Sequence, residues 1–380
     1  MGGGRFHWGG RQNAPGLARL NRDGSLDNSC RSGVDGYIKS IARQGDGQLL
    51  VAGYFGEANG LARTSLALFV NDASASLDRD FNPTITKLDG SVSDLKQVTP
   101  LANGQIMVAG HLRQADGITR TALVRLFSDG LLDTSFDAQI TITSGTSIRA
   151  NRVAEVNGKY LVSGYVTFEG LARGFLTRLT NTGALDASFG PTAAPTPSPN
   201  VNILAGEVKD MALQKDGRIM VCGDFSEIID GSFWDRPQRG HIARFTADGL
   251  LDGTFTTNIG ANNAINAMAL QPNGRIIIGG AFTRYNLPNY SDPDNRNHIA
   301  RVLSNGDLDA SFNPGSGLTD PSVASYLVSA NALTWLSSGK VLVGGGFSLY
   351  NGTARIKLAQ VLAGPANFNP GTFLLLLMDN

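Results

Sequence analysis

Short apolar runs recur along the whole chain, and each is bounded by glycines. The phrase occurs in six copies: GQLLVAGYF (47–55), GQIMVAGHL (104–112), GKYLVSGYV (158–166), GRIMVCGDF (217–225), GRIIIGGAF (274–282) and GKVLVGGGF (339–347). A moderately apolar stretch such as INAMALQPN (265–273) precedes the copies. Because Asp-Gly or Asn-Gly between two such runs is typical of a β-hairpin, the pattern predicts six hairpins of this kind.

A second phrase alternates with the first, and in it an Arg and an Asp stand eight residues apart. Five copies hold both residues: Arg19 and Asp27, Arg125 and Asp133, Arg178 and Asp186, Arg244 and Asp252, Arg301 and Asp309. A three-residue loop ending with a left-handed Gly would place the two residues opposite each other across a hairpin. We favour this structural ion pair over catalysis or metal binding, because catalytic groups converge once instead of recurring.

Two hairpins in every repeat give four antiparallel strands, and no segment sustains a helical period. Tandem four-stranded units without helices are the sequence form of a β-propeller. We therefore expect an all-β chain with a single propeller over residues 1–371, built from six four-stranded blades, with seven as the alternative. The Gly-rich strands are apolar on both faces, which favours an innermost position near the axis. The repeats lie near 31–82, 83–138, 139–190, 200–257, 258–313 and 322–371.

One hairpin is left over, because residues 1–30 supply an N-terminal half-repeat before the first complete repeat. The chain also carries an apolar tail, residues 372–380, which contains FLLLLMD (373–379). The surplus hairpin either packs on its own molecule or belongs to a longer array. Alternatively, residues 1–30 and 373–380 add strands to the next copy, which predicts the chain itself as a head-to-tail partner in an oligomer or filament.

The two phrases resemble the delta-60 repeat, a bacterial β-propeller repeat. The resemblance is carried by strands such as GRIIIGGAF (274–282) followed by ARVLSNGDLDASF (300–312), and it spans residues 5–371. Leu68 replaces the Arg in one copy, and the last copy loses both paired residues, to Gln360 and Pro365. The resemblance implies a propeller often found in large surface or secreted proteins, and it carries over no catalytic residue.

Composition narrows the classes of partner. The 32 basic and 32 acidic side chains cancel, which argues against nucleic acid and against a polybasic membrane surface. No stretch approaches the roughly 18 apolar residues of a membrane-spanning helix. Cys30 and Cys222 stand where other repeats carry Phe and Ala or Gly, so we expect two inert, buried thiols. MGGGRFHWGG (1–10) lacks the pattern of a secretory signal, and the extracellular or cell-surface location therefore rests on the resemblance.

Two long insertions, residues 226–240 and 283–297, hold the best candidates for ligand binding. Aromatic rings beside charged groups suit a glycan or a peptide, although long loops also pack their own aromatics. The candidates are Phe233, Trp234, Asp235, Arg236, Tyr285 and Tyr290. Oxygens of Asp292, Asp294 and Asn295 offer a weak calcium site, since the spacing lacks the Gly and Glu of an EF-hand. No other cofactor is expected.

The chain shows no catalytic motif. The four histidines lack metal-ligand spacing, and the GG pairs belong to strands instead of nucleotide-binding loops. We therefore expect a non-enzymatic extracellular scaffold or adhesion protein that assembles through its terminal segments. The alternative is a carbohydrate- or peptide-binding propeller that uses the face with the long loops.

Overall fold

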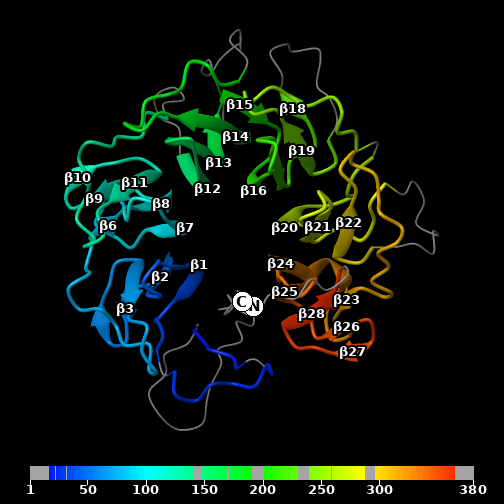
Figure 1. The fold of residues 1–380 in the computed structure, drawn as a ribbon, viewed down its shortest axis with the longest axis horizontal. Coiled ribbons are helices and arrows are strands. Elements are labelled where there is room, and N and C mark those ends of the chain that lie inside the picture. The colour runs from blue at the N-terminus through cyan, green and yellow to red at the C-terminus, as the bar shows by residue number, and fades with distance from the viewer. Residues whose placement is uncertain are drawn as a thin grey trace.

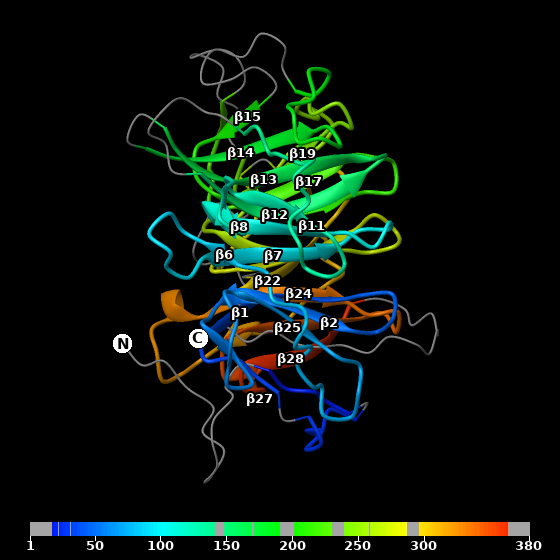
Figure 2. The ribbon, with the colours of Figure 1, turned by 90° about the vertical axis from the view of Figure 1, so that its left-hand side faces the viewer.

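The computed structural model is an all-β ring, as the sequence predicts. Its sheets surround a central axis (Figure 1), and the inner strands run roughly along that axis (Figure 2). Within the described residues the single helical element is a 3₁₀ turn, η1 (Ser325–Leu327). The structure describes residues 17–21, 23–30, 32–140, 148–168, 171–190, 201–229, 239–257, 259–286 and 296–363.

Each Gly-rich hairpin belongs to one antiparallel sheet, which we call a blade and number along the chain. From the axis outward the strands are β1 (Tyr37–Arg43), β2 (Leu49–Tyr54) and β5 (Leu66–Phe69) in blade 1; β7 (Asp94–Pro100), β8 (Ile106–His111) and β11 (Leu123–Leu126) in blade 2; β12 (Ile148–Val156), β13 (Lys159–Phe168) and β14 (Leu171–Leu179) in blade 3; β16 (Val208–Leu213), β17 (Ile219–Gly223) and β19 (Ile242–Phe245) in blade 4; β20 (Ile265–Leu270), β21 (Ile276–Gly280) and β22 (Ile299–Val302) in blade 5; and β24 (Ser329–Trp335), β25 (Lys340–Gly346) and β28 (Leu358–Leu362) in blade 6.

A fourth segment borders the third strand of blades 1 to 5 through an isolated β-bridge in each, and the sheet of blade 3 also continues through β15 and β18. The bridges are Phe69–Leu77, Leu126–Leu132, Leu179–Leu185, Phe245–Leu251 and Val302–Leu308. The smaller elements are β3 (Glu57–Ala58), β4 (Leu61–Ala62), β6 (Ile85–Thr86), β9 (Gln114–Ala115), β10 (Ile118–Thr119), β15 (Val201–Leu204), β18 (Ile228–Ile229), β23 (Leu318–Thr319), β26 (Leu349–Tyr350) and β27 (Thr353–Ala354).

The expected innermost position of the Gly-rich strands is wrong. These strands, such as β17 and β21, lie in the middle of their sheets, and the preceding strand of each blade lies at the axis. All five residues of β17 and of β21 are buried, whereas β16 is half-buried over most of its length. A middle strand has a hydrogen-bonded neighbour on each edge and a blade on each face, so its two apolar faces reflect burial within the sheet instead of proximity to the axis.

A β-bulge interrupts the inner strand of every blade. The pairing with the middle strand skips one residue near the start of the inner strand, and the skipped residues are Lys39, Lys96, Asn151, Lys209, Asn266 and Asn331. The Gly that ends each apolar run lies opposite this point. At Gly280 an added Cβ would lie 2.1 Å from the carbonyl oxygen of Ala264, and the five equivalent glycines leave 1.9 to 2.6 Å. The bulge therefore explains why the apolar run always ends in Gly.

We expect Gly280→Ala to lower the free energy of unfolding by about 2 to 3 kcal/mol, because the methyl group has to displace backbone in a packed sheet. The control is Gly253→Ala, where a Cβ meets nothing within 4 Å. Urea unfolding of the two variants checks the prediction. Equal stability of both would show that the bulge leaves room for a side chain.

Candidate functional site

The five Arg/Asp pairs predicted from the sequence are present. In each pair the arginine Nε lies 2.6 to 2.7 Å from Oδ2 of the aspartate. The turn is the expected three-residue loop: in blade 4, Gly249 has a φ of +81° and donates from its N–H to the carbonyl of Thr246. Asp252 N–H donates to the carbonyl of Arg244, so the two residues lie directly opposite each other.

The same arginines also hold the next blade, which the sequence reasoning missed. Nη1 of Arg178 donates to the carbonyl oxygen of Ala247 at 2.9 Å, in the outer turn of blade 4. Its Nη2 donates to Ser188 Oγ, and its guanidinium lies 4.8 Å from the ring centre of Phe189. The equivalent bonds to the next blade are Arg19 to Asp72, Arg125 to Asn181, Arg244 to Ser304 and Arg301 to Ala363. We call this arrangement the arginine clamp.

The repeated Arg/Asp phrase also contains the other residues of the clamp at fixed spacings from the arginine. A Ser or Thr follows the arginine by ten residues in all five copies, and a Phe follows by eleven residues in four of them. Cys30 takes the place of the Phe in the first copy. In blade 1, where Leu68 replaces the arginine, Arg63 donates instead to the carbonyl oxygens of Asp78 and Arg79.

We expect Arg244→Ala to cost about 3 kcal/mol of stability, because it removes the buried cation that lies closest to the carboxylate of Asp252, at 2.7 Å. The matched control is Arg218→Ala. Arg218 lies 3.5 Å from the same carboxylate, but its side chain is 43% exposed, against 3% for Arg244. The control should cost less than about 1 kcal/mol. Comparable losses of unfolding free energy in the two variants would rule out the clamp as a major stabilising contact.

The aspartates of the clamps have lowered pKa values. Burial acts to raise the pKa of Asp133, but hydrogen bonds from Ser135 and Arg125 outweigh it and hold the pKa below the ordinary value of 3.8. At the half-buried Asp27, hydrogen bonds from the Ser29 side chain and backbone and from Arg19 lower the pKa to about 2.

A pH dependence of stability follows from these shifts. Above the unfolded-state value of 3.8 the carboxylates are charged in both states, so their contribution is complete. As the pH falls from about 4 to about 2, the unfolded chain takes up protons first and the contribution is lost. We expect the thermal midpoint to drop over this range, and less steeply in Asp133→Asn. A variant that keeps the full slope would contradict this assignment.

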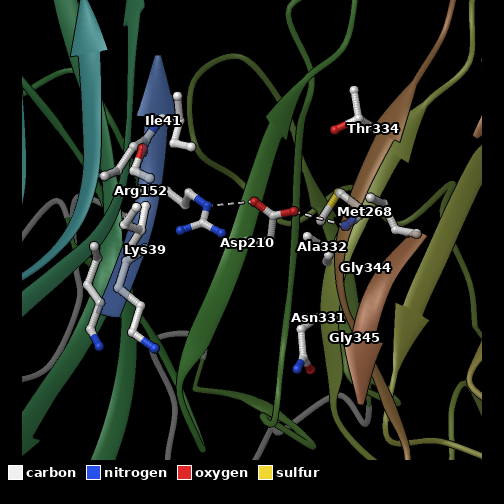
Figure 3. Close-up of a pocket in the computed structure, with 16 residues that line it drawn as sticks. Lys39, Ile41, Arg152, Asp210, Met268, Asn331, Ala332, Thr334, Gly344 and Gly345 are labelled. Carbon is white, nitrogen blue, oxygen red and sulfur yellow. Dashed lines mark hydrogen bonds and ion pairs between the residues drawn. The ribbon is translucent and has the colours of Figure 1, made fainter. Parts of the chain in front are cut away.

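A second candidate site lies on the axis, where a cavity of about 330 Å³ is lined by the inner strands of all six blades. Arg152 Nε lies 2.8 Å from Oδ1 of Asp210, and Oδ2 of Asp210 accepts the N–H of Met268 at 2.9 Å (Figure 3). One carboxylate therefore links blades 3, 4 and 5. Lys39 and Asn331 lie toward the same end of the cavity, opposite the end with Ile41 and Thr334 (Figure 3).

The six bulged residues, one in each inner strand, are all Lys or Asn, and we call this set the bulge ring. Three of them are joined by hydrogen bonds. Lys209 Nζ donates to Asn266 Oδ1 at 3.0 Å, and Asn266 Nδ2 donates to Asn331 Oδ1 at 3.1 Å. Lys96 Nζ lies 2.6 Å from Oδ2 of Asp94. Bulges re-aim side chains and are frequent next to functional sites. Sequence reasoning missed the ring, because a skipped residue leaves no mark in an apolar pattern.

Charges of both signs surround the bulge ring: Asp94 pairs with Lys96, and Glu207 pairs with Arg149. His111 ends β8 opposite Asp94, beside the bulge at Lys96. Burial lowers the pKa of His111, and the positive charges of Lys87, Arg113 and Arg149 lower it further. Among the residues that line the cavity itself, three cations, Lys39, Lys96 and Arg152, meet one carboxylate, Asp210.

Of the residues predicted to bind a ligand on the long loops, Tyr285 lies in the described part of the chain, and for Tyr285 the prediction is wrong. Tyr285 is fully buried in the core of blade 5, and its hydroxyl donates to the carbonyl of Gly306 at 2.9 Å. Burial raises its pKa. A core tyrosine of this kind cannot stack on a ligand. The other candidates, Phe233, Trp234, Asp235, Arg236, Tyr290, Asp292, Asp294 and Asn295, lie outside the described residues.

The remaining polar candidates have structural settings. Both cysteines are free: Cys222 is fully buried, which raises its pKa, and Cys30 is half-buried against the core of blade 1. His241 and His298 both adopt a φ of +68° just before the third strand of their blades. No group of three or more His, Cys, Asp or Glu in the described ranges is placed to hold a metal ion. The described part also contains no helix of the length and apolarity needed to cross a membrane.

Comparison with known proteins identifies the repeat. The model of one family, "Domain of unknown function (DUF5122) beta-propeller", matches seven segments: residues 1–29, 44–72, 101–136, 157–189, 214–255, 271–312 and 336–363. The chain belongs to this family. The β-propeller repeat implied by the sequence resemblance is therefore confirmed, under the name of the DUF5122 β-propeller. No curated protein matches the chain.

Several solved structures are similar to the DUF5122 β-propeller at low sequence identity. The extracellular domain of the putative hybrid two component system BT3049 from B. thetaiotaomicron has 15% identity and a TM-score of 0.45, covering 92% of this chain and 42% of that one. The structure of YCF48 bound to D1 peptide has 11% identity and a TM-score of 0.46, covering 92% and 85%. The Neurospora crassa Pan2 WD40 domain has 10% identity and a TM-score of 0.41, covering 88% and 83%.

Proposed function

We propose that this DUF5122 β-propeller is a non-enzymatic binding scaffold whose axial cavity takes an acidic segment of a partner protein. The observation that carries the proposal is the charge of the cavity lining, which holds Lys39, Lys96 and Arg152 but the single carboxylate of Asp210. Asp210 pairs with Arg152, and Asp94 beside the lining pairs with Lys96, so the charge of Lys39 is the excess. In a cleft with low-dielectric walls such an excess of one sign raises the local concentration of oppositely charged ligands.

The geometry of the scaffold supports binding over catalysis. The repeated Arg and Asp residues are engaged in the arginine clamps, so they stabilise the ring instead of supplying an acid or a base. The inner strands are tied to one another: Ser40 Oγ accepts the N–H of Val98 at 3.1 Å, and Gln97 Oε1 accepts the N–H of Val153 at 2.7 Å. These bonds hold the lining rigid, which lowers the entropic cost of ordering a site around a ligand.

The finer functional predictions from the sequence stay predictions. An extracellular location and a role in adhesion rest on the resemblance to repeats of surface proteins. Assembly is predicted through residues 1–30 and 373–380, of which residues 1–16 and 373–380 lie outside the described part of the chain. A glycan or peptide site on the long-loop face cannot include Tyr285, which is buried. The other side chains predicted for that site lie outside the described part of the chain.

Fluorescence anisotropy with a labelled hexaglutamate peptide tests the proposal. We expect saturable binding that weakens as salt is raised, and no binding of a hexalysine peptide of the same length. Lys39→Gln should weaken binding about tenfold, since it removes one of the cations that line the cavity.

The matched control is Lys215→Gln, which removes the same charge from an exposed turn six positions past the bulged Lys209 along the chain. This control should bind like the unchanged protein. If Lys39→Gln and Lys215→Gln bind equally well, or if neither peptide binds, the axial cavity is not the recognition site.

A further inference from the structure

One face of blade 6 is uncovered. Leu342 in β25 is half-buried, whereas its equivalents in the other blades are at most 2% exposed. These equivalents, each three residues before the Gly opposite the bulge, are Leu50, Met107, Leu161, Met220 and Ile277. In β28, Leu358 is half-buried and Gln360 is exposed, although all four residues of β5, β11, β19 and β22 are buried.

The cause of the difference is the neighbouring blade. Leu50 packs in one cluster with Leu95 and Ile106 of blade 2, and Ile277 packs with Val341 and Val343 of blade 6. Each such leucine, isoleucine or methionine is therefore covered by the blade that follows it. Leu342 points to the place where a blade following blade 6 would lie. We call the patch formed by Leu342, Leu358 and Gln360 the open face.

The hairpin at residues 17–30 occupies the outer part of that place. Arg19 Nη1 donates to the carbonyl of Asp72 in the outer turn of blade 1 at 3.1 Å, just as Arg125 of blade 2 reaches Asn181 of blade 3. Leu17 and Cys30 pack against the core of blade 1. The hairpin thus contacts blade 1 in the way that the third strand and the outer segment of blade 2 contact blade 3. Within the described residues no strand pairs with its inner edge.

We propose that the open face is the docking site for a strand, and that its occupant is the C-terminal segment 373–379 of the same chain. The ring then has a seventh blade position, shared between residues 17–30 and residues 373–379. The match of the family model to seven segments, of which 1–29 is the first, agrees with this number.

The sequence of the segment supports this occupant. FLLLLMDN (373–380) has the apolar run and the final Asn of NAMALQPN (266–273), which holds the inner strand of blade 5. It also follows FNPG (368–371), and an identical FNPG (312–315) follows the outer hairpin of blade 5. Its leucines complement Leu342 and Leu358. A strand added at the inner position of this blade removes an apolar surface from water.

Limited proteolysis with chymotrypsin, followed by mass spectrometry, tests the docking in the full chain. We expect cleavage after Phe373 and the following leucines to be slow, and to become at least about tenfold faster in Leu342→Asp, because a charge on the open face opposes docking of an apolar strand. The matched control is Leu327→Asp, which places the same charge on a leucine that is 58% exposed in η1. This control should leave the cleavage rate unchanged.

Hydrogen exchange supplies an independent readout. A chain that ends at residue 372 should exchange faster than the full chain in β25, β28 and residues 17–30. A synthetic peptide of residues 372–380 should restore the protection, and the same peptide with Leu375→Asp and Leu377→Asp should not. Cleavage that is equally fast in all full-length variants would overturn the proposal. Protection that appears only with dimers in sedimentation would assign the open face to a second copy and overturn it as well.

Discussion

The ring depends on one guanidinium in each clamped blade. Arginine carries five N–H donors in a rigid fork, so one side chain can bond an aspartate, a hydroxyl and a distant carbonyl at the same time. Arg178 does this with Asp186, Ser188 and Ala247. The first two contacts fix the hairpin of its own blade, and the third fixes the distance to the next blade. Local folding and the spacing around the ring are therefore set by the same residue.

A second constraint comes from the bulge of the inner strands. The close approach of the Ala264 carbonyl to Gly280 excludes any side chain there, and the skipped residue, Asn266, joins the polar ring instead of the core. The glycine at the end of the middle strand and the polar residues at the bulges near the axis thus have one geometric origin. The chemistry of the axial cavity can change at the bulged positions without disturbing the packing between blades.

The sequence predicted those features that are contained within one hairpin. The Arg/Asp register and the left-handed Gly of the turn follow from local spacing, as at Arg244, Gly249 and Asp252. It did not predict contacts between hairpins: the order of strands from the axis, the bond from Arg178 to Ala247, and the bulge ring. The prediction for Tyr285 was wrong for a related reason. An aromatic residue at the edge of a long insertion has the same sequence context whether it is buried or exposed.

The arginine clamp always points from one blade to the following one, so the ring has a direction. Each interface joins two different surfaces, a donor face and an acceptor face, instead of two identical ones. A gene that gains or loses one whole repeat therefore keeps every remaining junction in the same chemical form, while closure of the ring spreads the change of angle over all junctions. The replacement of the arginine by Leu68 shows that a single junction can drop the clamp while the apolar packing between blades 1 and 2 remains.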